Sequence, residues 1–88
     1  MSAEKEWIVY ILRCSDDTLY TGITNDLQGR IAMHNAGKGA KYTRGRGPVT
    51  PVYQEKCENY SLALRREHEI KQLTRKEKLS LCERLHNR

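Results

Sequence analysis

Three segments of the chain are rich in β-branched and aromatic residues, and segments with apolar residues at helical spacing lie between and after them. Residues 7–14 form the first strand-like segment and residues 18–24 form the second. Between them, Ser15, Asp16 and Asp17 favour a turn, because short polar side chains bond back to nearby backbone groups. The pattern therefore predicts a β-hairpin near the N-terminus.

The register of this hairpin decides whether Tyr10 and Tyr20 lie on the same face of the sheet. They do so only if the two sequence numbers in each cross-strand pair add up to an even value. This requires a loop with an odd number of residues. A three-residue loop at Ser15–Asp17 meets this condition. With that loop, we expect both tyrosines on one face.

A helix is expected directly after the hairpin. It starts at Thr24 to Asp26, where capping residues are abundant and the Asp26 charge complements the helix dipole. It ends near Gly37, because glycine readily adopts the left-handed conformation that closes a helix. Leu27 and Ile31, four residues apart, form its apolar stripe.

A third strand and a second helix are predicted in the second half of the chain. Residues 49–57 form the strand, and Pro51 indicates either an edge position or a strand start, since proline cannot donate to a ladder. Asn59 or Ser61 caps the helix, which reaches about Leu73.

A capping box predicts a third helix. Thr74 stands at the cap position and Glu77 follows three residues later, so that each side chain can bond a backbone N–H of the other residue. We expect this helix to reach about Leu85.

A basic, glycine-rich loop separates the first helix from the third strand. It carries four cations that favour contact with nucleic-acid phosphates, Lys38, Lys41, Arg44 and Arg46. Such contacts give salt-dependent and largely sequence-independent affinity. The alternative is a flexible loop with ordinary solubilising charge. The loop lacks the ending of a P-loop, so nucleotide hydrolysis is not expected.

Composition narrows the class of partner and the compartment. The 88 residues are expected to form one domain, 1–88, with a modest core. The formal net charge of +5 favours an anionic partner, nucleic acid before a membrane surface, unless the charge is merely solvated. Cys14, Cys57 and Cys82 are odd in number and widely spaced, so we expect free thiols and a cytoplasmic location. The longest apolar run, 7–12, is too short to span a membrane.

Glu67 is the most informative single residue. It lies four residues after Ala63 and three before Ile70, on the apolar stripe of the second helix. A carboxylate directed at a core is costly unless it is paired or coordinates an ion. Glu67 therefore pairs with an arginine, extends to the margin of the stripe, or binds a metal ion. Magnesium suits the last alternative, because one or two carboxylates often hold it while it keeps several waters.

Arg30 and His34 lie four residues apart on one edge of the first helix. Each has an ordinary alternative, since such an arginine is usually solvated and a lone histidine is usually a surface group. Together, and followed by the basic loop, they indicate phosphate chemistry. The planar guanidinium can form two parallel charge-assisted bonds to a phosphate.

Tyr10 and Tyr20 are ordinarily packing residues of a hairpin. A phenol is a poor base at its reference pKa of about 10, and becomes useful only if a metal-bound water or a nearby arginine favours its ionised form. Gly22 lies on the same strand face as Tyr20. Its missing side chain could let a substrate backbone approach, or could make room for a helix.

These residues, in this order, resemble the GIY-YIG nuclease superfamily. Residues 8–10 resemble the first half-motif and residues 20–22 the second. Arg30 and His34 follow at the family spacing, and the helix that carries Glu67 resembles the metal-binding helix of the family.

Two residues depart from the family pattern, and three further stretches resemble one branch of the family. Ile8 replaces the glycine of the first half-motif and Thr21 replaces an aliphatic residue, and neither change removes a catalytic group. Residues 37–41, 61–65 and 71–74 look like the small stand-alone bacterial branch of single-domain, UPF0213-like members.

The resemblance implies an α/β (α+β) fold, with a small three-stranded antiparallel sheet flanked by about three helices. It also implies hydrolysis of a DNA phosphodiester with one divalent metal ion, Mg²⁺ or alternatively Mn²⁺. Glu67 would hold the metal and Arg30 would stabilise the charge of the phosphate. Tyr20 or Tyr10 would act as base or orient the attacking water, and His34 would assist proton transfer. These roles suit phosphoryl transfer, which depends on positioning and charge neutralisation.

The leading hypothesis is a metal-dependent DNA endonuclease, acting on branched or damaged DNA in repair or recombination, with no membrane and no small-molecule cofactor. One rival is a nucleic-acid-binding module without catalysis, which the basic loop supports equally. Another is a scaffold that packs on a larger repair enzyme. The nuclease hypothesis requires Tyr10 and Tyr20 on one sheet face, and requires the second helix to bring Glu67 to that face.

Overall fold

The computed structural model describes residues 6–86, and describes side-chain burial as far as Glu83. Residues 1–5 and 87–88 of the predicted domain lie outside this range. The expected strands and helices are present: β1 (Trp7–Arg13), β2 (Leu19–Thr24), α1 (Leu27–Asn35), a 3₁₀ turn η1 (Lys41–Thr43), β3 (Thr50–Cys57), α2 (Tyr60–Lys71) and α3 (Arg75–His86).

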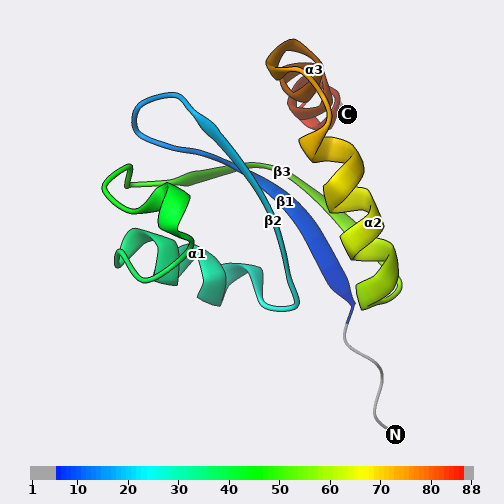
Figure 1. Cartoon of the computed structure of the whole chain (residues 1–88), viewed down its shortest axis with the longest axis horizontal. Helices are drawn as coiled ribbons and strands as arrows, with labels where there is room; N and C mark the ends of the chain where they lie inside the picture. The colour runs from blue at the N-terminus through cyan, green and yellow to red at the C-terminus, as the bar shows by residue number, and fades with distance from the viewer. Residues whose placement is uncertain (1–5, 87–88) are drawn as a thin grey trace, which may run out of the picture.

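The three strands form one antiparallel sheet in the order β2-β1-β3. Helix α1 lies on one side of this sheet, and α2 and α3 lie on the other (Figure 1). Because β1 is central and has both faces covered, its residues from Val9 to Leu12 are buried. The predicted α+β architecture is confirmed.

The hairpin register places both tyrosines on the face that α1 covers. Tyr10 opposes Gly22 and Leu12 opposes Tyr20, so the pairs add up to an even number. The Cys14 N–H donates to the Thr18 carbonyl at 2.8 Å, which leaves a three-residue loop. The prediction of an odd loop at Ser15–Asp17 is therefore confirmed.

Each face of β1 has its own core cluster. On the α2 side, Val9 and Ile11 pack with Ala63, Ile70 and Cys82, all fully or almost fully buried. A buried aliphatic side chain of this kind stabilises the fold by about 1.5–3 kcal/mol. On the α1 side the buried cluster is formed by Tyr10, Leu12, Cys14 and Val49, against which Leu27 and Ile31 pack.

Helix α1 is fixed at both ends by the residues expected from its sequence. The Asp26 carboxylate accepts a hydrogen bond from the Gly29 N–H at 3.2 Å. At the other end, the N–H of Gly37 donates to the His34 carbonyl at 3.1 Å, and the next N–H donates to the Met33 carbonyl at 2.9 Å. These bonds set where α1 begins and ends, while Leu27 and Ile31, packed on the core cluster, direct the helix toward the sheet.

The caps of α2 and α3 are also those of the sequence pattern. Asn59, and not Ser61, caps α2, because its side chain accepts from the Leu62 N–H at 2.9 Å. Thr74 and Glu77 form the predicted capping box with reciprocal bonds of 2.8 and 3.1 Å. The three cysteines are free, as expected.

Strand β3 begins at Thr50, one residue later than expected, and lies at an edge of the sheet. Pro51 opposes Leu12, and the register shifts between Leu12 and Ile11. The expectation of an edge strand from Pro51 is therefore confirmed. No helix among residues 6–86 is long and apolar enough to cross a membrane.

Candidate active site

A chain of three buried side chains occupies the α1 face of the sheet. The Tyr10 hydroxyl lies 3.2 Å from His34 Nε2, and His34 Nδ1 lies 2.7 Å from Thr43 Oγ1. The Thr43 hydroxyl donates in turn to the Ala40 carbonyl at 2.9 Å. The three side chains come from β1, α1 and η1, and each residue is at most 2% exposed.

The last bond of this chain fixes the direction of the others. A threonine hydroxyl has one proton, and Thr43 gives it to the Ala40 carbonyl, so Thr43 can only accept from His34. The neutral His34 ring must then carry its proton on Nδ1, which leaves Nε2 as an acceptor. In that tautomer the Tyr10 hydroxyl donates to His34 Nε2.

Two glycines make room for this arrangement. A Cβ on Gly22 would lie 2.6 Å from the Tyr10 hydroxyl, so the Tyr10 ring occupies the space that Gly22 leaves open. The space beside Gly22 therefore receives the Tyr10 ring and not a helix. A Cβ on Gly39 would collide with the His34 ring at Nδ1. The basic loop thus passes closely over the histidine.

Tyr20 completes an aromatic cluster around His34. Its ring centroid lies 5.4 Å from that of His34 and 6.3 Å from that of Tyr10. On its outer side it stacks against Tyr42 of η1, with 5.9 Å between centroids. Tyr20 is only partly buried, whereas Tyr10 is enclosed.

Burial and charge keep Tyr10 and His34 neutral. Burial is the main cause that raises the pKa of Tyr10 far above its usual value, the neighbouring Tyr20 and Glu67 add to this, and Arg30 opposes it. Burial also lowers the pKa of His34, and the positive charge of Arg30 lowers it further. The nearby arginine acts on Tyr10 in the expected direction but does not outweigh burial, so Tyr10 is a hydrogen-bond donor in the resting protein.

Arg30 lies on α1, one turn before His34, and is partly buried. It lines a shallow pocket with Thr24, Asp26, Gly29 and Met33. No carboxylate of residues 6–83 forms an ion pair with it, although its charge affects both Tyr10 and His34. The guanidinium is therefore available for an anion beside the tyrosine–histidine pair.

Glu67 reaches the site from a helix on the other side of the sheet. Helix α2 packs on the opposite face of the sheet through Ala63 and Ile70, because these residues form the apolar stripe of that helix. The requirement that α2 bring Glu67 to the tyrosine face stays a prediction. Helix α2 also contacts the edge strand β2, and the Glu67 charge is close enough to raise the pKa of Tyr10.

Glu67 forms an ion pair with a lysine and not with an arginine, and its side chain is mostly buried and does not extend into solvent. Its side chain is 18% exposed, and its carboxylate lies 3.3 Å from Nζ of Lys71, whose side chain is 51% exposed. A flexible, exposed lysine can move away at little cost. Within the described residues no group of three or more His, Cys, Asp and Glu side chains could hold a metal. A single carboxylate nevertheless fits a hydrated Mg²⁺, which needs only one or two.

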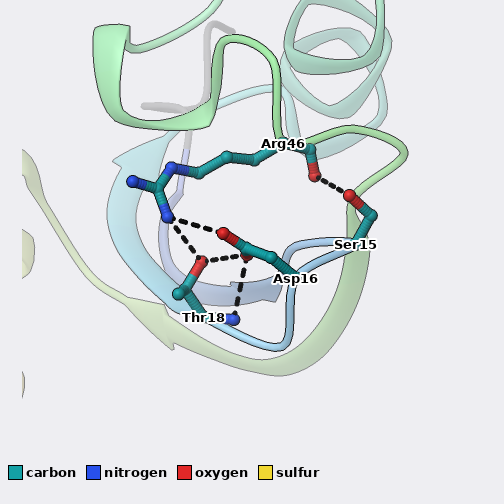
Figure 2. A network of polar contacts seen from close by, with 4 residues as sticks. All are labelled: Ser15, Asp16, Thr18 and Arg46. Atoms are coloured by element: carbon teal, nitrogen blue, oxygen red, sulfur yellow. Dashed lines mark hydrogen bonds and ion pairs between the residues drawn. The ribbon is translucent and has the colours of Figure 1, made fainter.

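The four basic residues of the loop have different environments. Lys38, Lys41 and Arg44 are exposed. Arg46 instead holds the loop against the hairpin turn, with its guanidinium 2.7 Å from the Asp16 carboxylate (Figure 2). The Arg46 carbonyl accepts from the backbone and the side chain of Ser15, at 2.7 and 2.9 Å. This network fixes the loop that carries Thr43 over His34.

Sequence reasoning missed Thr43 and Tyr42. Both lie in a loop that the glycines and cations identified only as a phosphate-contacting segment. Their spacing from His34 and Tyr20 follows no helical or strand period, so only the folded loop shows that they contact the site. Asp16, expected to serve the turn alone, also pairs with Arg46.

This fold and cluster define a domain of the kind that GIY-YIG nucleases share. A family model described as the GIY-YIG catalytic domain matches residues 6–80. The chain therefore belongs to the GIY-YIG family, a nuclease family, as the order of its motifs predicted.

Individual relatives include proteins named UPF0213, as the sequence pattern predicted. A UPF0213 protein of Oceanobacillus iheyensis is 56% identical over 80 residues, which are 91% of this chain and 93% of that protein. The solution NMR structure of a UPF0213 protein from Bacillus halodurans is 47% identical, with a TM-score of 0.56 over 86% of this chain and 81% of that one. The solution NMR structure of a protein from E. faecalis is 38% identical, with a TM-score of 0.65 over 100% of this chain and 94% of that one.

Proposed function

We propose that the protein is a metal-dependent endonuclease that hydrolyses DNA phosphodiester bonds. The observation that carries this proposal is the bond from Tyr10 to His34, with Arg30 and Glu67 close enough to affect the Tyr10 pKa. A proton acceptor, a cation for the phosphate and a carboxylate for a metal are the parts that phosphodiester hydrolysis needs. Family membership supports the same reaction class.

The proton path follows from the hydrogen bonds. As a water attacks phosphorus, its proton passes to the Tyr10 oxygen while the Tyr10 proton passes to His34 Nε2, which requires that the bound substrate bring that water into contact with the buried Tyr10 hydroxyl. His34 becomes an imidazolium and keeps its Nδ1 proton toward Thr43, and the leaving oxygen takes a proton from solvent. This path avoids a free phenolate, which burial of Tyr10 disfavours. Tyr20, more accessible than Tyr10, orients the water.

Arg30 and Glu67 supply the charges. The Arg30 guanidinium donates to the phosphate oxygens, on which negative charge develops. Glu67 would hold a Mg²⁺ or Mn²⁺ ion, which supplies charge neutralisation at the phosphate when bound. Lys71, now 3.3 Å from the Glu67 carboxylate, would release it to the ion.

The charge distribution favours a nucleic-acid substrate, and membership of a nuclease family favours DNA. Lys38, Lys41 and Arg44 extend into solvent from the loop that covers His34, so a strand held by them runs next to the site. Contacts of this kind are with phosphates and give little sequence preference. Because such contacts do not read the sequence, the enzyme would select its substrate by shape. Branched or damaged DNA, as in repair or recombination, has such a distinctive shape.

Glu67→Gln tests the proposal. Wild-type protein is expected to cut flap, nicked or four-way DNA in Mg²⁺, and the variant is expected to lose roughly 10²–10³-fold in rate, because a metal supplies several kcal/mol of charge stabilisation. Glu58→Gln, which changes an exposed carboxylate, is the matched control and should cut normally. Equal cutting by Glu67→Gln would contradict the metal role. Salt-dependent binding without cutting by wild type, across several metals, would instead favour the rival binding module.

A further inference from the structure

We infer that Thr43 is a positioning residue that sets the tautomer of His34, and thereby makes His34 Nε2 the acceptor of the Tyr10 proton. The inference rests on the proposed nuclease function for its effect on rate, but the tautomer itself can be measured without any substrate. It comes from the position of one hydroxyl group between His34 and the Ala40 carbonyl.

The competing tautomer would disrupt two bonds. With the His34 proton on Nε2, two hydrogens would face each other across the 3.2 Å contact, that of the ring N–H and that of the Tyr10 hydroxyl. Tyr10 would have to turn its hydrogen away. At the other end, an unprotonated Nδ1 would face the lone pairs of Thr43 at 2.7 Å, unless Thr43 released Ala40. Tyr10 and Thr43 are almost fully buried, so water offers little replacement for lost bonds.

The loop holds Thr43 in place for this role. Residues 41–43 form one turn of 3₁₀ helix, and the Thr43 N–H also donates to the Ala40 carbonyl at 3.0 Å. Beyond the turn, Arg46 ties the loop to Asp16 of the hairpin (Figure 2). The acceptor for His34 Nδ1 is therefore anchored to the same hairpin that carries Tyr10.

The test is the ¹⁵N spectrum of the His34 ring together with the cleavage rate. Wild type is expected to show the proton on Nδ1, and Thr43→Val is expected to lose this preference and about 10- to 100-fold in rate, as is typical when the partner of a functional histidine is removed. Thr43→Ser keeps a hydroxyl and should restore both. Thr21→Val is the matched control, because Thr21 is also buried but its hydroxyl has no partner among the described residues.

Each result decides the inference separately from the nuclease proposal. A wild-type His34 that carries its neutral proton on Nε2 overturns the inference without any variant. So does a folded Thr43→Val protein that keeps the Nδ1 proton and cuts at the wild-type rate. If wild type cuts nothing but its tautomer depends on Thr43, the positioning role holds and the nuclease proposal fails.

A second inference has an independent basis in a pocket beside Tyr42. Thr18 and Leu19 of the hairpin, Tyr42 of η1, and Arg75 and Lys78 of α3 line one shallow depression. We propose that it binds a backbone phosphate of the DNA strand that leaves the active site. The pocket combines two cations with the Tyr42 hydroxyl, a combination that suits a phosphate, while the Thr18 hydroxyl donates to Asp16.

Position and charge both favour this ligand. Tyr42 stacks on Tyr20, so the pocket begins one aromatic ring away from the tyrosine–histidine cluster. No carboxylate of residues 6–83 pairs with Arg75 or Lys78, and the nearby Asp16 is engaged by Arg46. Arg46 also lies 4.5 Å above the Tyr42 ring, and Tyr42 lines the pocket.

Binding of a labelled flap oligonucleotide in EDTA, measured by anisotropy at several salt concentrations, tests the pocket. Lys78→Gln is expected to weaken binding and to lower the slope of log K against log salt by about 0.7–0.9, the value for one phosphate contact. Lys76→Gln removes the same charge from the same turn of α3 outside the pocket, and should leave the slope nearly unchanged. Equal slopes for the two variants overturn the pocket. Absence of binding by wild type overturns the nucleic-acid function as well.

Discussion

The two faces of the sheet share strand β1 but are built differently. Val9 and Ile11 face α2 and α3, where the buried partners are Ala63, Ile70 and Cys82 and the contacts are apolar. On the opposite face, Tyr10 packs beside Leu12 but also bonds to His34, which is itself bonded to Thr43. Alternate residues of one strand therefore enter an apolar core and a polar network.

This difference indicates how a small domain separates stability from chemistry. The apolar face gains free energy roughly in proportion to buried area, whatever the detailed geometry. The polar face gains little net free energy from its hydrogen bonds, but each bond restricts where a proton can be. Substitutions on the two faces should consequently affect different measurements.

The largest expected effect is on the polar face. Tyr10→Phe removes the first member of the proton path, and the cleavage rate should fall by roughly 10²–10⁴-fold, the usual contribution of acid–base catalysis. Tyr53→Phe is the control on the other face, where the Tyr53 hydroxyl donates to Glu55 at 2.6 Å. A Tyr10→Phe enzyme with wild-type single-turnover rates would remove Tyr10 from the mechanism.

The next effect belongs to the apolar face. Ile70→Ala truncates a fully buried side chain and should lower the free energy of unfolding by about 2–5 kcal/mol. Leu64→Ala, a truncation on the same helix at a residue that is 41% exposed, should cost much less. Urea denaturation followed by circular dichroism measures both. Equal losses would show that α2 is not held by this cluster.

A smaller effect is expected where the apolar face contains a polar atom. Thr21 Oγ1 is buried there without a hydrogen-bond partner among the described residues. Thr21→Val replaces it by a methyl group of similar shape, and should raise the free energy of unfolding by about 1 kcal/mol. Thr50→Val at an exposed position is the comparison. A loss of stability in Thr21→Val would reveal an undetected partner for this hydroxyl.

The smallest effect is a pH dependence on the polar face. The pKa of His34 is lowered in the folded protein, mainly by burial, so the unfolded chain binds more protons between that pKa and the ordinary value of about 6.5. Stability should therefore rise with pH through this window and level off above about 6.5. Thermal unfolding of His34→Gln should show a weaker rise than wild type. An identical pH profile would mean that folding does not shift the pKa of His34.

Local elements were predictable because they depend on nearby residues. The cap at Asp26, the capping box of Thr74 and Glu77, and the loop at Ser15–Asp17 all formed as expected. The parity of that loop was enough to place Tyr10 and Tyr20 on one face. The family likewise followed from the order and spacing of motifs.

The layer of α2 and the partner of His34 were not predictable in the same way. The face of the sheet that a helix covers depends on how the apolar stripes of all the helices pack. The sequence of α2 alone therefore could not show that the helix carrying Glu67 lies on the face opposite the tyrosines. Thr43 contacts His34 only because Arg46 and Asp16, 30 residues apart in sequence, tie the loop to the hairpin. Such contacts between distant residues leave no periodic pattern.

The sequence by itself determined the elements, their caps, the shared face of the two tyrosines and the family, because these depend on local backbone preferences and on spacing. Only the tertiary structure decided that Tyr10, His34 and Thr43 lie within hydrogen-bonding distance of one another in one buried chain, and that Gly22 and Gly39 leave room for the two rings. The direction of a hydrogen bond depends on every donor and acceptor in the chain, and burial decides that no water can replace one of them.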